Sequence, residues 1–156
     1  MIRLDEILNP SDVLVNVPGV SKKRVLETIA KLVAQALPSL DYADVFECLV
    51  ERERLGSTGF GHGIAIPHCR LPNLTQAFSV VLRLDKAVDF DAVDNLPVDL
   101  LIVLVVPENA NDEHLQLLRQ IASMLNQDVV REKMRAAPDA AALYHIVLDS
   151  LPQARE

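Results

Sequence analysis

The chain contains 156 residues, half of them hydrophobic, which is enough to bury the core of a globular domain. Its formal net charge is -7 and its basic residues are scattered along the chain, which argues against nucleic acid as a partner. The longest apolar run, residues 100–106, is far shorter than the ~20 residues that cross a bilayer, and the amino terminus lacks a signal-peptide pattern. We therefore expect a cytoplasmic protein that does not insert into a membrane.

The first third of the chain predicts one strand and two long helices. Residues 4–8 suit a short helical turn, and residues 11–17 alternate in hydropathy like a half-buried strand. A helix is predicted over residues 21–37, with the serine at its first position as the cap, and a second helix over residues 41–55, with Gly56 as its carboxyl cap. The apolar side chains of the first helix recur at helical spacing, at Val25, Ile29, Leu32, Val33 and Leu37.

The rest of the chain predicts strands followed by helices. Residues 77–84 are rich in β-branched and aromatic side chains, and residues 98–106 are so continuously apolar that they fit a central strand covered on both faces. Helices are predicted over residues 111–127, 128–137 and 139–150. This interleaving predicts an α/β fold: a single-domain sandwich over residues 1–156, with a mixed β-sheet flanked by helices on both faces.

A glycine-rich loop lies between these two halves, in the stretch GSTGFGHGIAIPHCR over residues 56–70. Glycine allows the backbone to approach a ligand closely, so successive amides of this loop can face an anion, and the hydroxyls of Ser57 and Thr58 add donors. Four of the five glycines of the chain are in this stretch, at Gly56, Gly59, Gly61 and Gly63. We therefore expect phosphate binding by Ser57, Thr58, Gly61 and Gly63.

His68 ends the same stretch and is the candidate nucleophile. Pro67 biases the residue before it toward extended geometry, so residues 63–66 are predicted as a strand whose end holds His68 in a defined place. Neutral imidazole is a competent nucleophile near pH 7, so His68 can carry a phosphoryl group. The residues alone leave a second interpretation equally open, in which the glycines form an ordinary connection and His68 only hydrogen-bonds its neighbours.

The residues around His68 resemble a known family. The stretch RERLGSTGFGHGIAIPHCR, residues 52–70, is similar to the signature of the enzyme IIA domains of the phosphoenolpyruvate-dependent phosphotransferase system, of the mannitol/fructose type. The similarity extends to residues 20–34, 90–107 and 114–125 and thus covers nearly the whole chain. Within the family the chain most resembles the freestanding, nitrogen-related members.

The resemblance implies that His68 accepts the phosphoryl group from a small histidine phosphocarrier similar to HPr, and that Arg52 and His114 assist it. Arg52 lies in a predicted helix row with Val45 and Leu49, so its head can reach the site, although a solvated charge is the simpler interpretation. His114 falls in the first turn of its helix, where unpaired amides favour an anion, although it could equally be a core histidine. No metal ion or other cofactor is expected, and the sequence has no P-loop lysine motif.

Two residues depart from the family pattern, which commonly has asparagine at His62 and glycine at Cys69. His62 is either a surface variant or a ring beside the phosphoryl group. Cys69 directly follows His68 and should point to the opposite face, so a cysteine–histidine dyad is not expected, and with Cys48 it lacks a metal-motif spacing. A zinc site made by His62, His68, His114 and Cys69 is possible in principle but matches no zinc pattern. We expect both cysteines to be reduced thiols.

The function expected from the resemblance is that of a phosphohistidine carrier whose phosphorylation state regulates nitrogen and potassium physiology through regulatory protein targets. The alternative is a sugar-specific enzyme IIA that passes its phosphoryl group to a separate enzyme IIB. The chain carries no recognisable enzyme IIB or membrane domain, which favours the regulatory interpretation.

Overall fold

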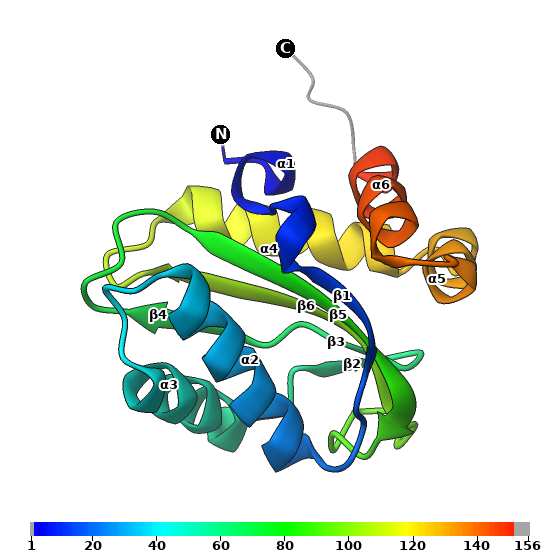
Figure 1. The fold of residues 1–156 in the computed structure, drawn as a ribbon, viewed down its shortest axis with the longest axis horizontal. Coiled ribbons are helices and arrows are strands. Elements are labelled where there is room, and N and C mark those ends of the chain that lie inside the picture. Colours follow the sequence, from blue (N-terminus) through cyan, green and yellow to red (C-terminus); the bar gives the residue numbers. More distant parts are fainter. Residues whose placement is uncertain (1, 152–156) are drawn as a thin grey trace.

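The computed structural model describes residues 2–151 and contains a six-stranded mixed sheet between two layers of helices (Figure 1). The helices are α1 (Leu4–Ile7), the 3-10 turn η1 (Pro10–Asp12), α2 (Lys22–Ala36), α3 (Tyr42–Leu55), α4 (Asp112–Leu125), α5 (Asp128–Ala136) and α6 (Ala140–Ser150). The strands are β1 (Val13–Val17), β2 (Gly59–Gly61), β3 (Ile64–Ala65), β4 (His68–Leu71), β5 (Phe78–Val88) and β6 (Val98–Pro107).

The sheet has the strand order β1-β5-β6-β3-β2, and β4 also pairs with β6. The β5–β6 and β2–β3 pairs are antiparallel, whereas β1 runs parallel to β5 and both β3 and β4 run parallel to β6. Helices α2 and α3 pack on one face of the sheet, and α1, α4, α5 and α6 pack on the other. The predicted α/β sandwich with a mixed sheet is therefore confirmed.

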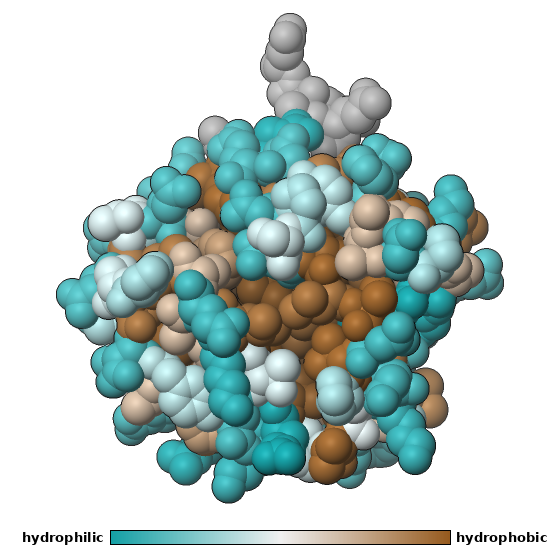
Figure 2. Space-filling view, in the orientation of Figure 1, coloured by the Kyte–Doolittle hydropathy of each residue, from teal (hydrophilic) through white to brown (hydrophobic). Residues whose placement is uncertain are grey.

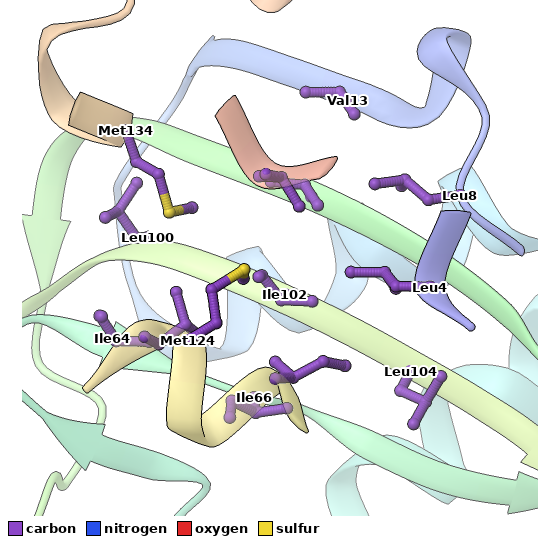
Figure 3. Packing of buried hydrophobic residues seen from close by; sticks show 14 of the residues in the cluster. Leu4, Leu8, Val13, Ile64, Ile66, Leu100, Ile102, Leu104, Met124 and Met134 are labelled. Carbon is purple, nitrogen blue, oxygen red and sulfur yellow. The ribbon is translucent and has the colours of Figure 1, made fainter. Parts of the chain in front are cut away.

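Strand β6 is buried on both faces, as its unbroken apolar run predicts. Successive side chains of a strand point to opposite faces, so this strand contributes to both cores. Leu100, Ile102 and Leu104 pack toward α1 and α4, as Figure 3 shows, whereas Leu101, Val103 and Val105 pack toward α2 and α3. In Figure 2, hydrophobic residues gather at the centre of the face shown and hydrophilic residues surround them.

The segment around Pro67 differs from its predicted form. Residues 63–66 are not one strand ending at His68, because β3 covers only Ile64–Ala65 and His68 is the first residue of a new strand, β4. Proline has no N–H to donate to the ladder, and it interrupts the pairing there. Ile64 faces Leu100 and His68 faces Leu104, so both short strands keep one register along β6. The interruption thus leaves His68 anchored to the central strand of the sheet.

Two predicted helix caps are present, Ser21 at the start of α2 and Gly56 at the end of α3. The Ser21 hydroxyl accepts a hydrogen bond from the Arg24 amide at 3.2 Å at the start of α2. Gly56 follows α3 with a φ of 152°, in a backbone region that residues with side chains rarely adopt.

Within residues 2–151, no helix is both long and apolar enough to cross a membrane.

Candidate active site

A pocket of about 810 Å³ opens between α3, β4 and the start of α4. Arg52, His68 and His114 all line this pocket, each from a different one of these three elements. Leu55 and Leu115 also line it, and these large hydrophobic side chains are 86% and 47% exposed. The site is therefore an open depression that contains the three polar side chains, and its exposed lining combines these hydrophobic side chains with charged ones.

Arg52 lies in the last turn of α3 and is held at two points. One terminal nitrogen donates to the Gly56 carbonyl at 2.8 Å, and Nε donates to Nε2 of His68 at 3.2 Å. The row predicted from Val45 and Leu49 is buried, which directs the arginine stem along the sheet-facing side of the helix. Arg52 is thus bound to the candidate nucleophile rather than being a solvated surface charge.

The two ring nitrogens of His68 have opposite roles. Nδ1 lies 2.8 Å from the carbonyl oxygen of Ile66, which can only accept, so Nδ1 carries the proton. Nε2 accepts from Arg52, so its lone pair points into the pocket. Burial lowers the pKa of His68 below its ordinary value, and the Arg52 charge adds to this effect, against opposing contributions from the Ile66 hydrogen bond and Glu53. The ring is therefore neutral and nucleophilic at neutral pH.

His114 is oriented by the amino-terminal cap of α4. The Asn111 amide donates to Nδ1 of His114 at 3.3 Å, and the Asn111 side chain accepts from the Glu113 amide at 3.0 Å. Because Nδ1 accepts, the proton of the neutral ring is on Nε2. His114 consequently offers a donor rather than a second nucleophilic lone pair.

The four predicted phosphate-binding residues are not among those lining the pocket. The Ser57 hydroxyl donates to the Phe90 carbonyl at 2.6 Å, and the Thr58 amide and hydroxyl both donate to the Glu53 carboxylate. Gly61 and Gly63 have φ values of 107° and 80°, and an added Cβ at Gly63 would lie 2.4 Å from the Arg135 guanidinium. The role of these four residues in phosphate binding stays a prediction, and the geometry gives them a role in shaping the loop.

Glu53 does not line the pocket, but it supports the site from beside Arg52, and the sequence does not reveal this. Its side chain is only 6% exposed, and besides Thr58 it contacts Lys22 Nζ at 3.0 Å. The carboxylate therefore joins the end of α3 to the glycine loop and to α2, directly beside Arg52. Its position in the charged run ERER, residues 51–54, gave no signal, because local periodicity does not distinguish this glutamate from the other charged residues of the run.

His62 lies outside the pocket that holds His68. It is exposed, its amide donates to Asp94 at 2.9 Å, and its carbonyl accepts from Arg135 at 2.6 Å. The structure therefore does not bring together the four residues of the hypothetical zinc site. Across residues 2–151, no group of three or more histidine, cysteine, aspartate or glutamate side chains is placed to hold a metal ion.

The fold and the pocket together define an α/β sandwich in which a neutral histidine, hydrogen-bonded to an arginine, shares one pocket with a second histidine. A family model described as "Phosphoenolpyruvate-dependent sugar phosphotransferase system, EIIA 2" matches residues 6–150. The chain belongs to this family, and it is therefore a phosphotransferase component.

Individual relatives agree with this assignment. A nitrogen regulatory protein of Pseudomonas aeruginosa is 64% identical over 149 residues, which are 96% of this chain and 97% of the relative. The nitrogen regulatory protein of Escherichia coli is 41% identical over 150 residues, covering 96% and 91% of the two chains. The crystal structure of nitrogen regulatory protein IIA-Ntr from Neisseria meningitidis has a TM-score of 0.87 and 41% identity, covering 92% of this chain and 98% of that one. The mannitol IIA of E. coli, at a TM-score of 0.74 and 16% identity over 89% and 97% of the chains, shares the fold.

Proposed function

We propose that this protein is a phosphohistidine carrier that accepts a phosphoryl group on Nε2 of His68 from a histidine phosphocarrier similar to HPr. The observation that supports this most directly is the pair of hydrogen bonds on the His68 ring. They place the proton on Nδ1 and the lone pair on Nε2, which faces the pocket. No metal ion or nucleotide takes part in this proposal.

The transfer needs a placed nucleophile and charge stabilisation rather than bond-making by other protein groups. Nε2 of His68 attacks phosphorus, and the bond between phosphorus and the donor's histidine breaks as the new one forms. The Nδ1 proton stays on the ring and keeps its hydrogen bond to the Ile66 carbonyl. No proton has to leave His68, because the attacking nitrogen carries none.

Arg52 and His114 then stabilise the transferred group. Arg52 gives up its hydrogen bond to Nε2 as phosphorus approaches, and the freed Nε–H binds an equatorial oxygen while Gly56 still holds the other end of the guanidinium. His114 contributes its Nε2 proton, and the start of α4 adds the partial positive charge of a helix amino terminus. These donors are fixed before the reaction, which is the condition for strong charge stabilisation.

The donor in this proposal is a protein. The pocket is wide and shallow enough for another protein's histidine to reach Nε2, and the exposed Leu55 and Leu115 at its rim offer apolar area for a transient contact. We further propose that the phosphorylation state regulates nitrogen and potassium physiology, because the relatives that share 64% and 41% of this sequence are named nitrogen regulatory proteins. Passing phosphate to a sugar-specific enzyme IIB is the alternative.

The test of the carrier activity is reconstitution with phosphoenolpyruvate and purified candidate carrier proteins, followed by mapping of the modified residue. We expect one phosphoryl group on His68, lost in acid and retained in alkali as for a phosphoramidate. His68→Ala should remain folded and accept none, and His145→Ala, which removes an exposed histidine on α6, should accept normally. Phosphorylation of folded His68→Ala would refute the assignment.

A cellular comparison separates the regulatory function from the sugar-carrier alternative. A strain carrying His68→Ala in place of the native residue should change its nitrogen or potassium requirements while taking up fructose and mannitol normally. Loss of uptake of one of these sugars, with unchanged nitrogen and potassium requirements, would instead support transfer to an enzyme IIB.

A further inference from the structure

Two thiols line the same pocket as His68 and have no part in the proposed transfer. Cys48 is on α3, four residues before Arg52, and Cys69 is on β4, directly after His68. Both cysteines are free in the structure. The pocket therefore holds a possible redox pair next to a phosphoryl acceptor.

The geometry brings these two thiols together. The Cys48 thiol donates to the carbonyl oxygen of Arg70 at 3.0 Å, so it points at the residue that follows Cys69 on β4. Cys48 also packs against the buried cluster that contains Cys69. Helix α3, which carries Cys48, packs directly against β4, which carries Cys69. Two thiols that line one pocket, on a helix and a strand packed against each other, are placed for an intrachain disulfide.

The two thiols are also unequal in a way that orders their reactions. Cys69 is 6% exposed, whereas Cys48 is partly exposed on the pocket wall. The interaction with Cys69 lowers the pKa of Cys48 despite the opposing effects of burial and Glu51, while the interaction with Cys48 and burial raise the pKa of Cys69. Cys48 is thus the accessible, more acidic thiol, which is the one that oxidants attack, and Cys69 is placed to resolve it.

We propose that Cys48 and Cys69 are a dithiol that hydroperoxides oxidise to a disulfide, and that this disulfide slows phosphoryl acceptance by His68. The second half of this inference rests on the proposed function of His68. The first half, the oxidation site itself, does not depend on it.

The chemistry balances with hydrogen peroxide as the oxidant. The Cys48 thiolate attacks one peroxide oxygen, the O–O bond breaks, and the released hydroxide takes up the thiol proton to form water. The resulting sulfenic acid is attacked by the Cys69 sulfur, the S–S bond forms, the S–O bond breaks, and the leaving hydroxide takes the Cys69 proton as a second water. Two thiols and one peroxide thus give one disulfide and two waters.

The disulfide affects His68 through α3. Bonding to Cys69 removes the Cys48 hydrogen bond to Arg70 and draws this turn of α3 toward β4. Arg52 lies one turn further along the same face of the helix, and its Nε is only 3.2 Å from the attacking nitrogen. Displacements of about 1 Å at reacting groups can reduce rates by roughly 10²-fold, so we expect acceptance to slow by about tenfold.

The experiment treats the reduced full chain with hydrogen peroxide and maps thiols by alkylation and peptide mass spectrometry under non-reducing conditions. We expect a Cys48–Cys69 peptide that dithiothreitol reverses. Cys69→Ala should stop at a sulfenic acid on Cys48, which dimedone traps, and Cys48→Ala should leave Cys69 unmodified. Intermolecular disulfides only, or dimedone labelling of Cys69 in preference to Cys48, would overturn the oxidation site.

The second arm measures phosphoryl acceptance by reduced and oxidised protein. The oxidised wild type should be about tenfold slower and recover with dithiothreitol, whereas Cys48→Ala should be insensitive to peroxide. Equal rates for a fully oxidised and a reduced wild type would overturn the effect on His68. If the reduced protein accepts no phosphoryl group at all, the proposed function fails while the mapped disulfide still decides the oxidation site.

Discussion

The tautomer of His68 is set by hydrogen bonds to the two nitrogens of its ring. The Ile66 carbonyl holds the proton on Nδ1, and Arg52 faces the lone pair of Nε2. In His114 the arrangement is reversed, since Nδ1 accepts from the Asn111 amide and Nε2 becomes the donor. In our proposal, the two histidines of the pocket therefore take complementary roles, as nucleophile and as donor, because of the backbone groups beside them.

Removing either donor should slow transfer without unfolding the protein. We expect Arg52→Ala and His114→Ala each to lose about 2.7–4 kcal/mol of transition-state stabilisation, or roughly 10²–10³-fold in rate, because each removes one preorganised donor. Rapid-quench measurement of phosphoryl acceptance checks this, with circular dichroism to verify the fold. Arg119→Ala, an exposed arginine on α4 outside the pocket, is the matched control. Unchanged rates in both pocket variants would exclude a charge-stabilising role.

His62 should prove to be a structural variant of the loop. Its φ of 58° is a conformation that asparagine also accepts readily, and its exposed ring lies outside the pocket. We expect His62→Asn to leave both phosphoryl acceptance and the pH profile of phosphohistidine hydrolysis unchanged. A shifted hydrolysis profile between about pH 5 and 8 would instead place this ring beside the phosphoryl group.

At the scale of elements, the site is assembled where short, irregular segments meet rigid ones. Pro67 divides the strand that precedes the histidine, yet β3 and β4 keep one register on β6, so His68 is anchored to the best-buried strand of the sheet. On the other side of the pocket, Glu53 ties the end of α3 to the glycine loop and to α2. The glycine loop is therefore fixed to the helix that carries Arg52.

The Glu53 contacts should contribute measurably to stability. Glu53→Ala leaves the buried Thr58 hydroxyl and amide without their acceptor, which we expect to lower the free energy of unfolding by about 1–3 kcal/mol. Urea unfolding measures this change. Glu47→Ala, an exposed glutamate on the same helix, should stay within about 0.5 kcal/mol of the wild type. Equal free energies of unfolding for the two variants would show that the Glu53 carboxylate does not stabilise the fold through these contacts.

At the scale of the whole molecule, the sheet carries two separate cores that meet only through its strands. One core joins the sheet to α2 and α3, and the other joins it to α1, α4, α5 and α6. The pocket lies at the edge where both layers approach β4, with α3 from one layer and α4 from the other. Arg52 and His114 thus belong to different layers, and both layers must be folded for Arg52, His68 and His114 to line one pocket.

The lowered pKa of His68 links this assembly to pH. In the unfolded chain the ring takes up its proton near its ordinary pKa of ~6.5, whereas burial keeps it neutral to lower pH in the folded protein. Below pH ~6.5 the unfolded state therefore binds more protons, and the free energy of unfolding should fall as pH decreases. Urea unfolding measured from about pH 8 to about pH 5 should show that the free energy of unfolding falls more steeply toward acid pH for wild type than for His68→Ala. Parallel curves would contradict the lowered pKa.

Local patterns in the sequence were sufficient for much of the architecture. Helical spacing predicted α2 and α3, the apolar run predicted the doubly buried β6, and the glycines with Pro67 marked the segment that leads to His68. These features depend on neighbours within a few residues, so the hydrophobic periodicity and the turn residues that produce them can be recognised in the sequence alone. The family resemblance added Arg52 and His114, which spacing alone left as a solvated charge and a core histidine.

Only the tertiary structure decided which side chains meet and which atoms face each other. The distance from Arg52 to His68, the contact of Glu53 with Lys22 and the packing of Cys48 on the cluster that contains Cys69 all join segments that are separate in sequence. The protonated nitrogen of each histidine is set by a nearby backbone group, but only the coordinates show which nitrogen that group meets. The tertiary structure also placed His62 outside the pocket, where the sequence had left two interpretations open, and it divided the predicted strand at Pro67. The physical reason is that these contacts result from how two helical layers pack on one sheet. Such packing produces no periodic pattern in the sequence, so distances between separate segments cannot be inferred from it.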